Sequence, residues 1–360
     1  MKLFPKIDMK EATRLTKLGK LQEALAVLSG KAPNHGEVDP DVIDMTPPST
    51  TSAAWTASTA HEGKPRPYRR GAGTASLPEG RHFATFSFAN AAGQRDYKLY
   101  TPSHYDGSPM PLVVMLHGCT QSPDDFATGT GMNRLAEDHG FLVAYPAQPQ
   151  NANANRCWNW FRPEDQVRDR GEPAIIAGII RQIMDDHAIL PAQVFAAGLS
   201  AGGAEAAILA VTYPELFAAI GVHSGLAAGS AHDIPSAFAA MSQGAKPAGR
   251  PGGIPIPTIV FHGDADHTVH RSNGDQVIAQ CVAGHSLASQ IHEGVSAGGR
   301  AYTRTVTSET GGRVRTEHWR IHGAGHAWSG GNAAGSYTDP KGPDASQEML
   351  RFFFEAARRP

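Results

Sequence analysis

The sequence Gly-x-Ser-x-Gly at residues 198–202 carries the side chain best suited to nucleophilic chemistry. An apolar run at residues 194–197 precedes it, and an alanine-rich run follows it. This pattern predicts a strand, a sharp turn and a helix, with Ser200 held on the turn in a strained conformation. The free N–H groups at the start of that helix favour developing negative charge. We therefore predict that Ser200 is a nucleophile. The alternative is an ordinary Gly/Ser loop between a core strand and a core helix.

A serine nucleophile needs a base to take its proton and a third group to orient that base. Two loops after Ser200 hold candidates, Asp264 and Asp266 in one and His322 and His326 in the other. Each loop follows an apolar run, and the order Ser, Asp, His is the order of the α/β-hydrolase fold. We predict His326, whose Gly-rich loop lets its ring reach Ser200, and Asp266, which lies further into its loop. Asp264 is the second choice, and capping of a turn is the alternative role of both acids.

The tetrahedral intermediate of such a reaction needs two N–H donors for its negatively charged oxygen. The backbone N–H of Ala201, directly after Ser200, is the first candidate. The second should come from a loop after an early strand, and the apolar run at residues 112–116 leads into His-Gly-Cys-Thr-Gln. We predict the backbone N–H of Cys119 for this role. A small buried apolar side chain, the alternative role of Cys119, is compatible with it.

The elements that must position these groups follow one another along the chain. Apolar runs predict strands at residues 83–89, 97–101, 112–117, 141–145, 194–198, 217–222, 258–262, 302–308 and 314–321. Helical patterns cover residues 124–139, 173–187, 201–211, 273–281 and 345–357. The alternation predicts an α/β fold with a mostly parallel central sheet and helices on both faces. The order Ser, Asp, His indicates that this fold is of the α/β-hydrolase type. Ligands of such sheets bind at the carboxyl ends of the strands, where the candidate residues lie.

The composition of the chain excludes several classes of function. The 360 residues carry a formal net charge of -2, which gives no electrostatic reason to expect a nucleic-acid partner. The three cysteines form neither a disulfide framework nor a metal-site spacing. No apolar run is long enough to span a membrane, and the first residues lack the apolar stretch of a secretory signal. We expect no metal, no cofactor and no membrane span. We also expect a cytoplasmic location, unless the protein is secreted by another route.

The chain is predicted to have three parts. Residues 1–30 contain an amphipathic helical pattern at 9–29, with leucines at helical spacing and basic residues between them. That helix either attaches the protein to an apolar surface such as a polymer granule or packs on its own domain or a second subunit. Residues 31–80 are rich in Pro, Gly, Ser, Thr and Ala, which predicts a linker or a poorly ordered arm. Residues 81–360 are predicted to form the catalytic domain.

Five ordered motifs together resemble the polyhydroxybutyrate (PHB) depolymerase-like esterases, a family with the α/β-hydrolase fold. The motifs are residues 116–121, 157–161, 198–203, 262–269 and 325–331, and the resemblance covers about residues 80–358. It implies a serine esterase that acts on poly(3-hydroxybutyrate)-type polyesters or hydroxyalkanoate oligomers. It also implies Ser200, Asp266 and His326 as the catalytic triad, with Cys119 and Ala201 lining the oxyanion hole.

The chain departs from typical secreted members of that family. We find no secretion signal and no recognisable polymer-binding domain after the catalytic domain, and the N-terminal arm is additional. These departures favour an intracellular member that acts on amorphous polymer or soluble oligomers. The family also includes proteins similar to feruloyl and acetylxylan esterases, so the fold leaves the substrate open. A peptidase of the same fold is a further alternative, as is a granule-associated binding protein attached through residues 9–29. The oligomeric state is left open.

Three tryptophans in the family motifs are candidate substrate-binding residues. Trp158 and Trp160 lie two residues apart and face one way on an extended segment, and Trp328 lies two residues after His326. They are predicted to form an apolar wall for acyl chains, with ordinary core packing as the alternative. Cys119 and Cys157 belong to adjacent motifs of the family, so a disulfide between them is an open question. The expected cytoplasmic location argues against that bond.

Overall fold

The computed structural model describes residues 82–245, 256–284 and 286–357. The predicted helix within residues 1–30, its attachment role and the predicted arm at 31–80 lie outside the described residues.

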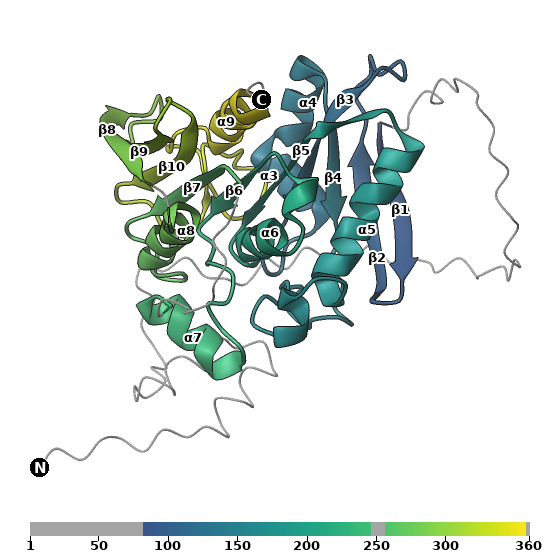
Figure 1. Ribbon diagram of the computed structural model, residues 1–360, viewed down its shortest axis with the longest axis horizontal. Helices are drawn as coiled ribbons and strands as arrows, with labels where there is room; N and C mark the ends of the chain where they lie inside the picture. Colours follow the sequence, from purple (N-terminus) through teal and green to yellow (C-terminus); the bar gives the residue numbers. More distant parts are fainter. Residues whose placement is uncertain (1–81, 246–255, 285, 358–360) are drawn as a thin grey trace, which may run out of the picture. The chain divides into compact units, whose positions relative to one another are not determined.

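A ten-stranded sheet forms the centre of the described structure (Figure 1). Its strands lie in the order β1-β2-β4-β3-β5-β6-β7-β10-β9-β8. Their bounds are β1 Phe83–Asn90, β2 Gly93–Tyr100, β3 Met110–Leu116, β4 Leu142–Pro146, β5 Ile189–Leu199, β6 Ala219–His223, β7 Thr258–Gly263, β8 Leu287–Val295, β9 Ala301–Glu309 and β10 Val314–Ile321. The six strands from β4 to β10 in this order are parallel to one another, while β1 and β2 at one edge and β9 and β8 at the other pair antiparallel.

The central strands are apolar because both faces of the sheet are covered. In β3, Val113 and Met115 belong to one hydrophobic core, and Leu112, Val114 and Leu116 belong to the other. All five side chains are fully buried. Because side chains alternate along a strand, a strand buried on both faces shows the continuous apolar run that the sequence contains here.

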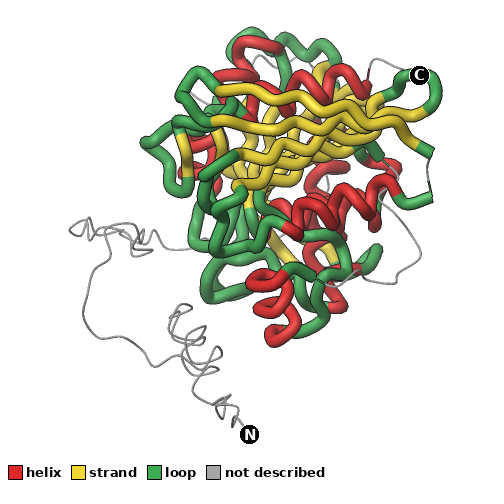
Figure 2. Tube along the Cα trace, turned by 90° about the vertical axis from the view of Figure 1, so that its left-hand side faces the viewer, coloured by secondary structure: helices red, strands yellow, loops and turns green. Residues whose placement is uncertain are grey.

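Helices cover both faces of this sheet (Figure 2). Their bounds are α3 Pro123–Thr130, α4 Met132–His139, α5 Gly171–Asp186, α6 Ala201–Thr212, α7 Ile234–Gln243, α8 Ser272–Val282 and α9 Ala345–Ala357. Helices α5, α6 and α8 contribute to the core on one face, and α3, α4 and α9 contribute to the core on the other. Among the described helices, none combines the length and apolar composition needed to cross a membrane.

Two sequence-based expectations for the elements need correction. The helix expected at residues 124–139 is two helices, α3 and α4, separated by Gly131. Gly131 has a φ of 63° and donates its N–H to the carbonyl of Ala127, so it ends the first helix in the left-handed conformation that glycine favours. Helix α7 and strand β8 were not expected. The Asp233–Ser236 capping box at the start of α7 is a signal that the sequence does contain.

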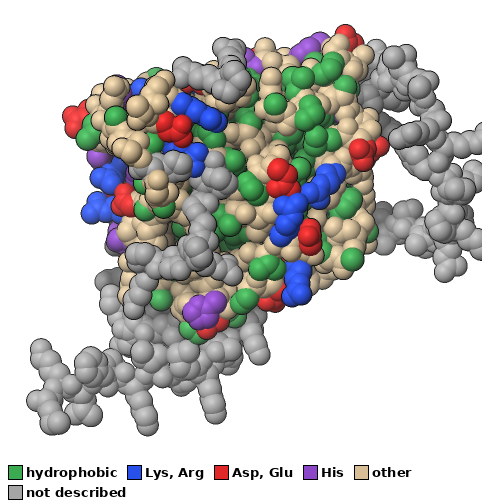
Figure 3. Space-filling model, in the orientation of Figure 1, with side chains coloured by type: hydrophobic (Ala, Val, Ile, Leu, Met, Phe, Trp, Pro, Cys, Tyr) green, Lys and Arg blue, Asp and Glu red, His purple; other side chains and the backbone are tan. Residues whose placement is uncertain are grey.

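Acidic and basic side chains lie beside one another on the face of the molecule shown in Figure 3. Among the exposed ion pairs of the described residues, Arg168 pairs with Glu215 at 2.7 Å, and Arg181 lies 3.9 Å from the same carboxylate. These exposed pairs add little stability, because water screens them. The hydrophobic contacts of the two cores therefore carry most of the stability of the sheet.

Candidate active site

Ser200 lies on a sharp turn between β5 and α6, at the carboxyl end of a central strand. Its φ of 57° and ψ of -118° are strained for a residue with a side chain. Glycine is required on both sides of the turn. A Cβ at Gly198 would lie 2.3 Å from backbone atoms of Gly202, and a Cβ at Gly202 would lie 2.0 Å from the carbonyl oxygen of Leu116. The predicted strand–turn–helix is therefore present, and its glycines leave the space that the turn needs.

The loop after β3 lies directly beside this turn. A Cβ at Gly118 would lie 3.5 Å from the carbonyl oxygen of Leu199, the residue before Ser200. Within the described part of the chain, the backbone N–H groups of Cys119 and Ala201 have no protein acceptor. Two free N–H groups in adjoining segments are what an oxyanion requires.

The acid and the histidine favoured from the sequence form a close pair. Asp266, in the loop after β7, places Oδ2 2.7 Å from Nδ1 of His326. Its other oxygen, Oδ1, accepts the backbone N–H groups of Thr268 and Val269, each at 2.9 Å. The carboxylate is fully buried and the His326 side chain is 11% exposed. With Nδ1–H donated to Asp266, Nε2 of His326 carries the lone pair that a general base needs.

Burial and the neighbouring histidines shift the pKa of the Asp266 carboxyl in opposite directions. Burial alone would raise the pKa, but the attraction and hydrogen bond of His326, with the attraction of His262, lower it to about 2. Asp266 is therefore ionised at neutral pH. An ionised carboxylate in this position favours the tautomer of a histidine ring that directs Nδ1–H toward it.

The second choice of acid, Asp264, has a different partner. Its Oδ2 lies 2.8 Å from Nδ1 of His322, and its Oδ1 accepts the backbone N–H of Gly323 at 2.7 Å. His322 in turn contacts Thr303, with Nε2 3.0 Å from the hydroxyl oxygen. The structure thus separates the two acids and the two histidines into two pairs, and the Asp264 pair holds the start of the Gly-rich loop.

The structure contains a disulfide between Cys119 and Cys157, with a Cα–Cα distance of 4.2 Å. The sequence left this bond open, and the expected cytoplasmic location argued against it. The structure answers this open question, because the loops after β3 and β4 meet and bring the two cysteines together. The bond ties the backbone of the second predicted oxyanion donor to a neighbouring loop.

Three buried histidines at strand ends also shape the site, and sequence reasoning did not assign them a role. His117 follows β3, His223 ends β6 and His262 lies in β7. Burial lowers the pKa of all three, to about 4 for His117 and about 3 for His223. They are therefore neutral at pH 7, and their rings form hydrogen bonds to backbone groups of neighbouring segments. Their common signal in the sequence is a histidine at the carboxyl end of an apolar run.

His223 joins the serine turn to the histidine loop. Its carbonyl accepts the N–H of Ser200 at 2.9 Å, and its ring Nε2 accepts the N–H of Ser329 at 3.0 Å. The ring also stacks on Trp328, with centroids 5.1 Å apart. Because Ser329 lies three residues after His326, one buried side chain fixes both loops. His262 acts similarly in the acid loop, where Nε2 lies 2.8 Å from the carbonyl oxygen of Val269.

The three tryptophans predicted to bind substrate are buried. Trp158 is 0% exposed, Trp160 5% and Trp328 1%. The indole N–H of Trp158 donates to the carbonyl of His117, and that of Trp328 donates to the hydroxyl of Ser346. These contacts favour the core-packing alternative. Direct binding of substrate by these residues stays a prediction.

The described residues contain no group of three or more His, Cys, Asp or Glu side chains placed to hold a metal ion. The candidate site is instead a set of loops at the carboxyl ends of parallel strands. The turn after β5 carries the strained Ser200, and the loops after β7 and β10 carry the Asp266–His326 pair.

This arrangement is an α/β-hydrolase fold. An acetyl xylan esterase from Aspergillus awamori matches it with a TM-score of 0.58, covering 76% of this chain and 99% of that chain at 20% identity. A puromycin hydrolase matches with a TM-score of 0.50, covering 78% of this chain and 40% of that chain at 16% identity. At such identities the likeness is one of fold alone.

Residues 95–300 match the family model described as Esterase PHB depolymerase, and the chain belongs to that family. Poly(3-hydroxyalkanoate) depolymerase C of Paucimonas lemoignei is 34% identical over 228 residues, 60% of this chain and 54% of the relative. Poly(3-hydroxybutyrate) depolymerase of Ralstonia pickettii is 30% identical over 240 residues, 61% of this chain and 48% of the relative. Feruloyl esterase B of Thermothelomyces thermophilus is 34% identical over 140 residues, 39% of this chain and 47% of the relative. The chain spans about half the length of these relatives.

Proposed function

We propose that the protein is a carboxylic ester hydrolase that uses Ser200 as nucleophile, His326 as base and Asp266 as the acid that orients it. The observation that carries this proposal is the 2.7 Å contact between the buried Asp266 carboxylate and Nδ1 of His326. That contact leaves Nε2 as the acceptor, and the strained turn presents Ser200 at the start of α6 in the same group of loops.

In the proposed mechanism, His326 takes the proton of Ser200 as the hydroxyl attacks the ester carbonyl. The N–H groups of Cys119 and Ala201 donate to the oxyanion of the tetrahedral intermediate. His326 then protonates the leaving alkoxide, and an acyl-enzyme remains on Ser200. Water activated by the same histidine releases the acid and restores the serine. Neutral His326 starts each half of the reaction, so the rate should fall when that ring is protonated.

The proposed substrates are poly(3-hydroxybutyrate)-type polyesters or hydroxyalkanoate oligomers. Family membership and the names of the relatives from Paucimonas lemoignei and Ralstonia pickettii support this substrate class. The proposal concerns the ester bond between short hydroxyacyl units, which a serine hydrolase cleaves without a cofactor.

A feruloyl or acetylxylan esterase is the second candidate. Feruloyl esterase B and Acetylxylan esterase A of Talaromyces purpureogenus are each 34% identical to this chain over about 140 residues. Because the same triad chemistry serves both substrate classes, only the acyl pocket distinguishes them.

Parallel hydrolysis assays test the proposal. Purified protein is given amorphous poly(3-hydroxybutyrate), with release of soluble hydroxybutyrate measured, and separately methyl ferulate, with a Ser200→Ala protein as the blank. Turnover of the polymer that is lost in the blank is the expected result. Turnover of ferulate with inert polymer would favour the second candidate. Equal rates in the wild type and the blank, on either substrate, would place the nucleophile elsewhere.

A granule-associated binding protein is the alternative from another class, with residues 9–29 as its attachment. Deleting residues 1–75, which include the predicted helix, tests that role. Loss of partition onto polymer granules with unchanged hydrolysis of a soluble ester is the result expected of an attachment helix. Unchanged partition would contradict it.

The cytoplasmic location is likewise a prediction, and the Cys119–Cys157 disulfide argues against it, because such bonds persist in oxidising compartments. Thiol labelling of protein taken directly from the producing cells tests the two alternatives.

A further inference from the structure

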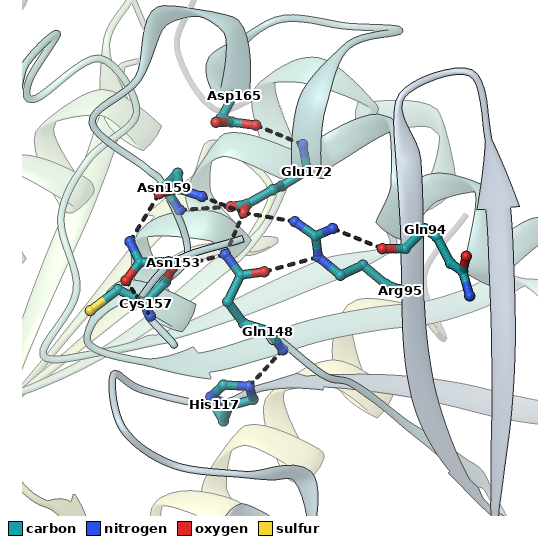
Figure 4. Close-up of polar contacts among 9 residues, drawn as sticks. All are labelled: Gln94, Arg95, His117, Gln148, Asn153, Cys157, Asn159, Asp165 and Glu172. Atoms are coloured by element: carbon teal, nitrogen blue, oxygen red, sulfur yellow. Dashed lines mark hydrogen bonds and ion pairs between the residues drawn. The ribbon is translucent and has the colours of Figure 1, made fainter. Parts of the chain in front are cut away.

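A buried network of polar side chains surrounds the carboxylate of Glu172, near the start of α5 (Figure 4). Glu172 is 2% exposed. Its Oε2 accepts the backbone N–H of Asn159 at 2.6 Å, and its Oε1 accepts the side-chain amide of the same residue at 2.7 Å. Oε1 also accepts from the amide of Gln148 and from the guanidinium of Arg95 at 3.2 Å.

Burial and repulsion from Asp165 raise the pKa of Glu172, and the four donor contacts to its carboxylate act in the opposite direction. Arg95 supplies the balancing charge, and its side chain is 12% exposed. Its Nε donates to the amide oxygen of Gln148 at 2.9 Å, which fixes the orientation of that amide. Removing one partner from such a buried, fully paired group leaves the others unpaired and is costly.

Three of the four contacts, those of Gln148 and Asn159, come from the segment between β4 and the next short helix, residues 147–162. This segment contains neither an α-helix nor a strand, and several of its backbone groups have side-chain partners. Glu172 accepts the N–H of Asn159 near one end, and Gln148 near the other end donates to both Glu172 and the carbonyl of Cys157. One carboxylate therefore joins the two ends of the segment.

The same segment holds the loop after β3. The N–H of Gln148 donates to Nε2 of His117 at 3.1 Å, and the indole N–H of Trp158 donates to the carbonyl of His117 at 3.0 Å. The N–H of Thr120 donates to the carbonyl of Asn155 at 2.7 Å. The Cys119–Cys157 disulfide is a further connection. Every one of these contacts lies within two residues of the N–H of Cys119.

We propose that Glu172, together with Arg95 and Gln148, is a positioning residue that fixes the backbone N–H of Cys119 for the oxyanion. This inference rests on the proposed function, because it concerns the same site. Glu172 touches no reacting atom and acts through the segment 147–162. Catalysis is sensitive to small displacements of such donors, and a shift of about 1 Å costs up to about 100-fold in rate.

A neighbouring acid supplies a matched control. Glu205 in α6 is 0% exposed, and neither of its oxygens has a hydrogen-bond partner within the described residues. Burial, with repulsion from Glu172 and Asp165, raises its pKa well above the usual range, so it is neutral. Glu205→Gln therefore replaces one neutral side chain by another of the same shape and removes no hydrogen bond that the described residues show.

The test compares Glu172→Gln with Glu205→Gln in the full chain, using p-nitrophenyl butyrate as substrate and Ser200→Ala as the blank. Glutamine at position 172 offers one oxygen in place of two and points an amide donor at other donors. We expect kcat to fall roughly 10- to 100-fold with KM within about threefold of wild type. Backbone hydrogen exchange in residues 117–120 should also become faster. Glu205→Gln should match the wild type in both measurements.

The outcomes separate this inference from the proposed function. A folded Glu172→Gln protein with wild-type kcat overturns the inference, as does an equal loss of kcat in Glu205→Gln. If Glu172→Gln does not fold, the Arg95→Lys variant tests the inference instead. Lysine keeps the positive charge but loses the guanidinium that donates to both Gln148 and Glu172. A kcat lowered at least threefold supports the inference, and an unchanged kcat overturns it. Equal rates in the wild type and the Ser200→Ala blank would instead overturn the proposed function. In that case, backbone hydrogen exchange in residues 117–120, which needs no substrate, shows whether Glu172 holds the loop after β3.

Discussion

At the scale of single residues, the site depends on which of two neighbouring carboxylates pairs with which histidine. Asp264 and Asp266 lie in one loop, two residues apart. Asp266 is buried against His326, whereas Asp264 is partly exposed and holds His322. Only the first pair has the fully buried carboxylate that keeps a catalytic histidine in one tautomer.

Replacing the two acids one at a time tests this assignment. Asp266→Asn should lower kcat about 1,000- to 10,000-fold, because the amide favours the wrong tautomer of His326. Asp264→Asn should keep kcat within about tenfold of wild type, because its pair contacts only the start of the loop. Steady-state kinetics on p-nitrophenyl butyrate measure both. The reverse order of the two effects would show that Asp264 is the functional acid.

At the scale of elements, the site is made of loops that follow strands, and the contacts between loops decide its geometry. The loop after β3 supplies Cys119, and the segment after β4 supplies the residues that hold it. The Cys119–Cys157 bond closes a loop of 38 residues, and such a closure contributes about 4 kcal/mol by reducing the freedom of the unfolded chain.

Removal of that bond should affect both stability and rate. Cys157→Ser is expected to lower the free energy of unfolding by about 2–4 kcal/mol and to lower kcat, because the Cys119 backbone loses one anchor. Urea denaturation and steady-state kinetics measure the two effects. Cys281→Ala is the control, since Cys281 is a buried cysteine that forms no disulfide and is not one of the candidate site residues. Wild-type kcat in Cys157→Ser would show that the hydrogen bonds alone hold the oxyanion loop.

At the scale of the whole molecule, buried neutral histidines make stability depend on pH. His117 and His223 have pKa values lowered to about 4 and about 3, mainly by burial. Between about pH 6.5 and these values the unfolded chain binds protons that the folded chain does not. The free energy of unfolding therefore falls as the pH falls, by about 1.4 kcal/mol per unit for each histidine. Asp266, with its pKa lowered to about 2, adds a further loss only below about pH 4.

Urea denaturation at a series of pH values tests this dependence. We expect the free energy of unfolding to fall by several kcal/mol, to order of magnitude, between pH 7 and pH 4. His223→Gln should be less stable at pH 7 but should show a shallower fall, because one buried group no longer titrates. His232→Gln, at an exposed position, should keep the wild-type slope. A slope in His223→Gln equal to that of the wild type would contradict the assignment.

Much of this protein can be predicted from local sequence. The Gly-x-Ser-x-Gly pattern determined the turn at Ser200, because only glycine fits at positions 198 and 202. Apolar runs predicted the parallel strands, because both faces of those strands are buried. The family resemblance of the motifs agrees with the family match over residues 95–300. The pairing of Asp266 with His326 was predicted from loop position, and the structure brings these two side chains together.

Only the tertiary structure decided the contacts between segments distant in the sequence. No local pattern shows that Glu172 meets Arg95, 77 residues away, or that His223 joins two loops. The burial of the three tryptophans and the Cys119–Cys157 bond are likewise set by contacts between distant segments. Burial and pairing are properties of packed neighbours, and these set the pKa values and the hydrogen bonds. The sequence by itself predicted the candidate reactive groups, and it determined the turn, the strands and most of the helices that carry them. Packing determined which groups meet and in which protonation state.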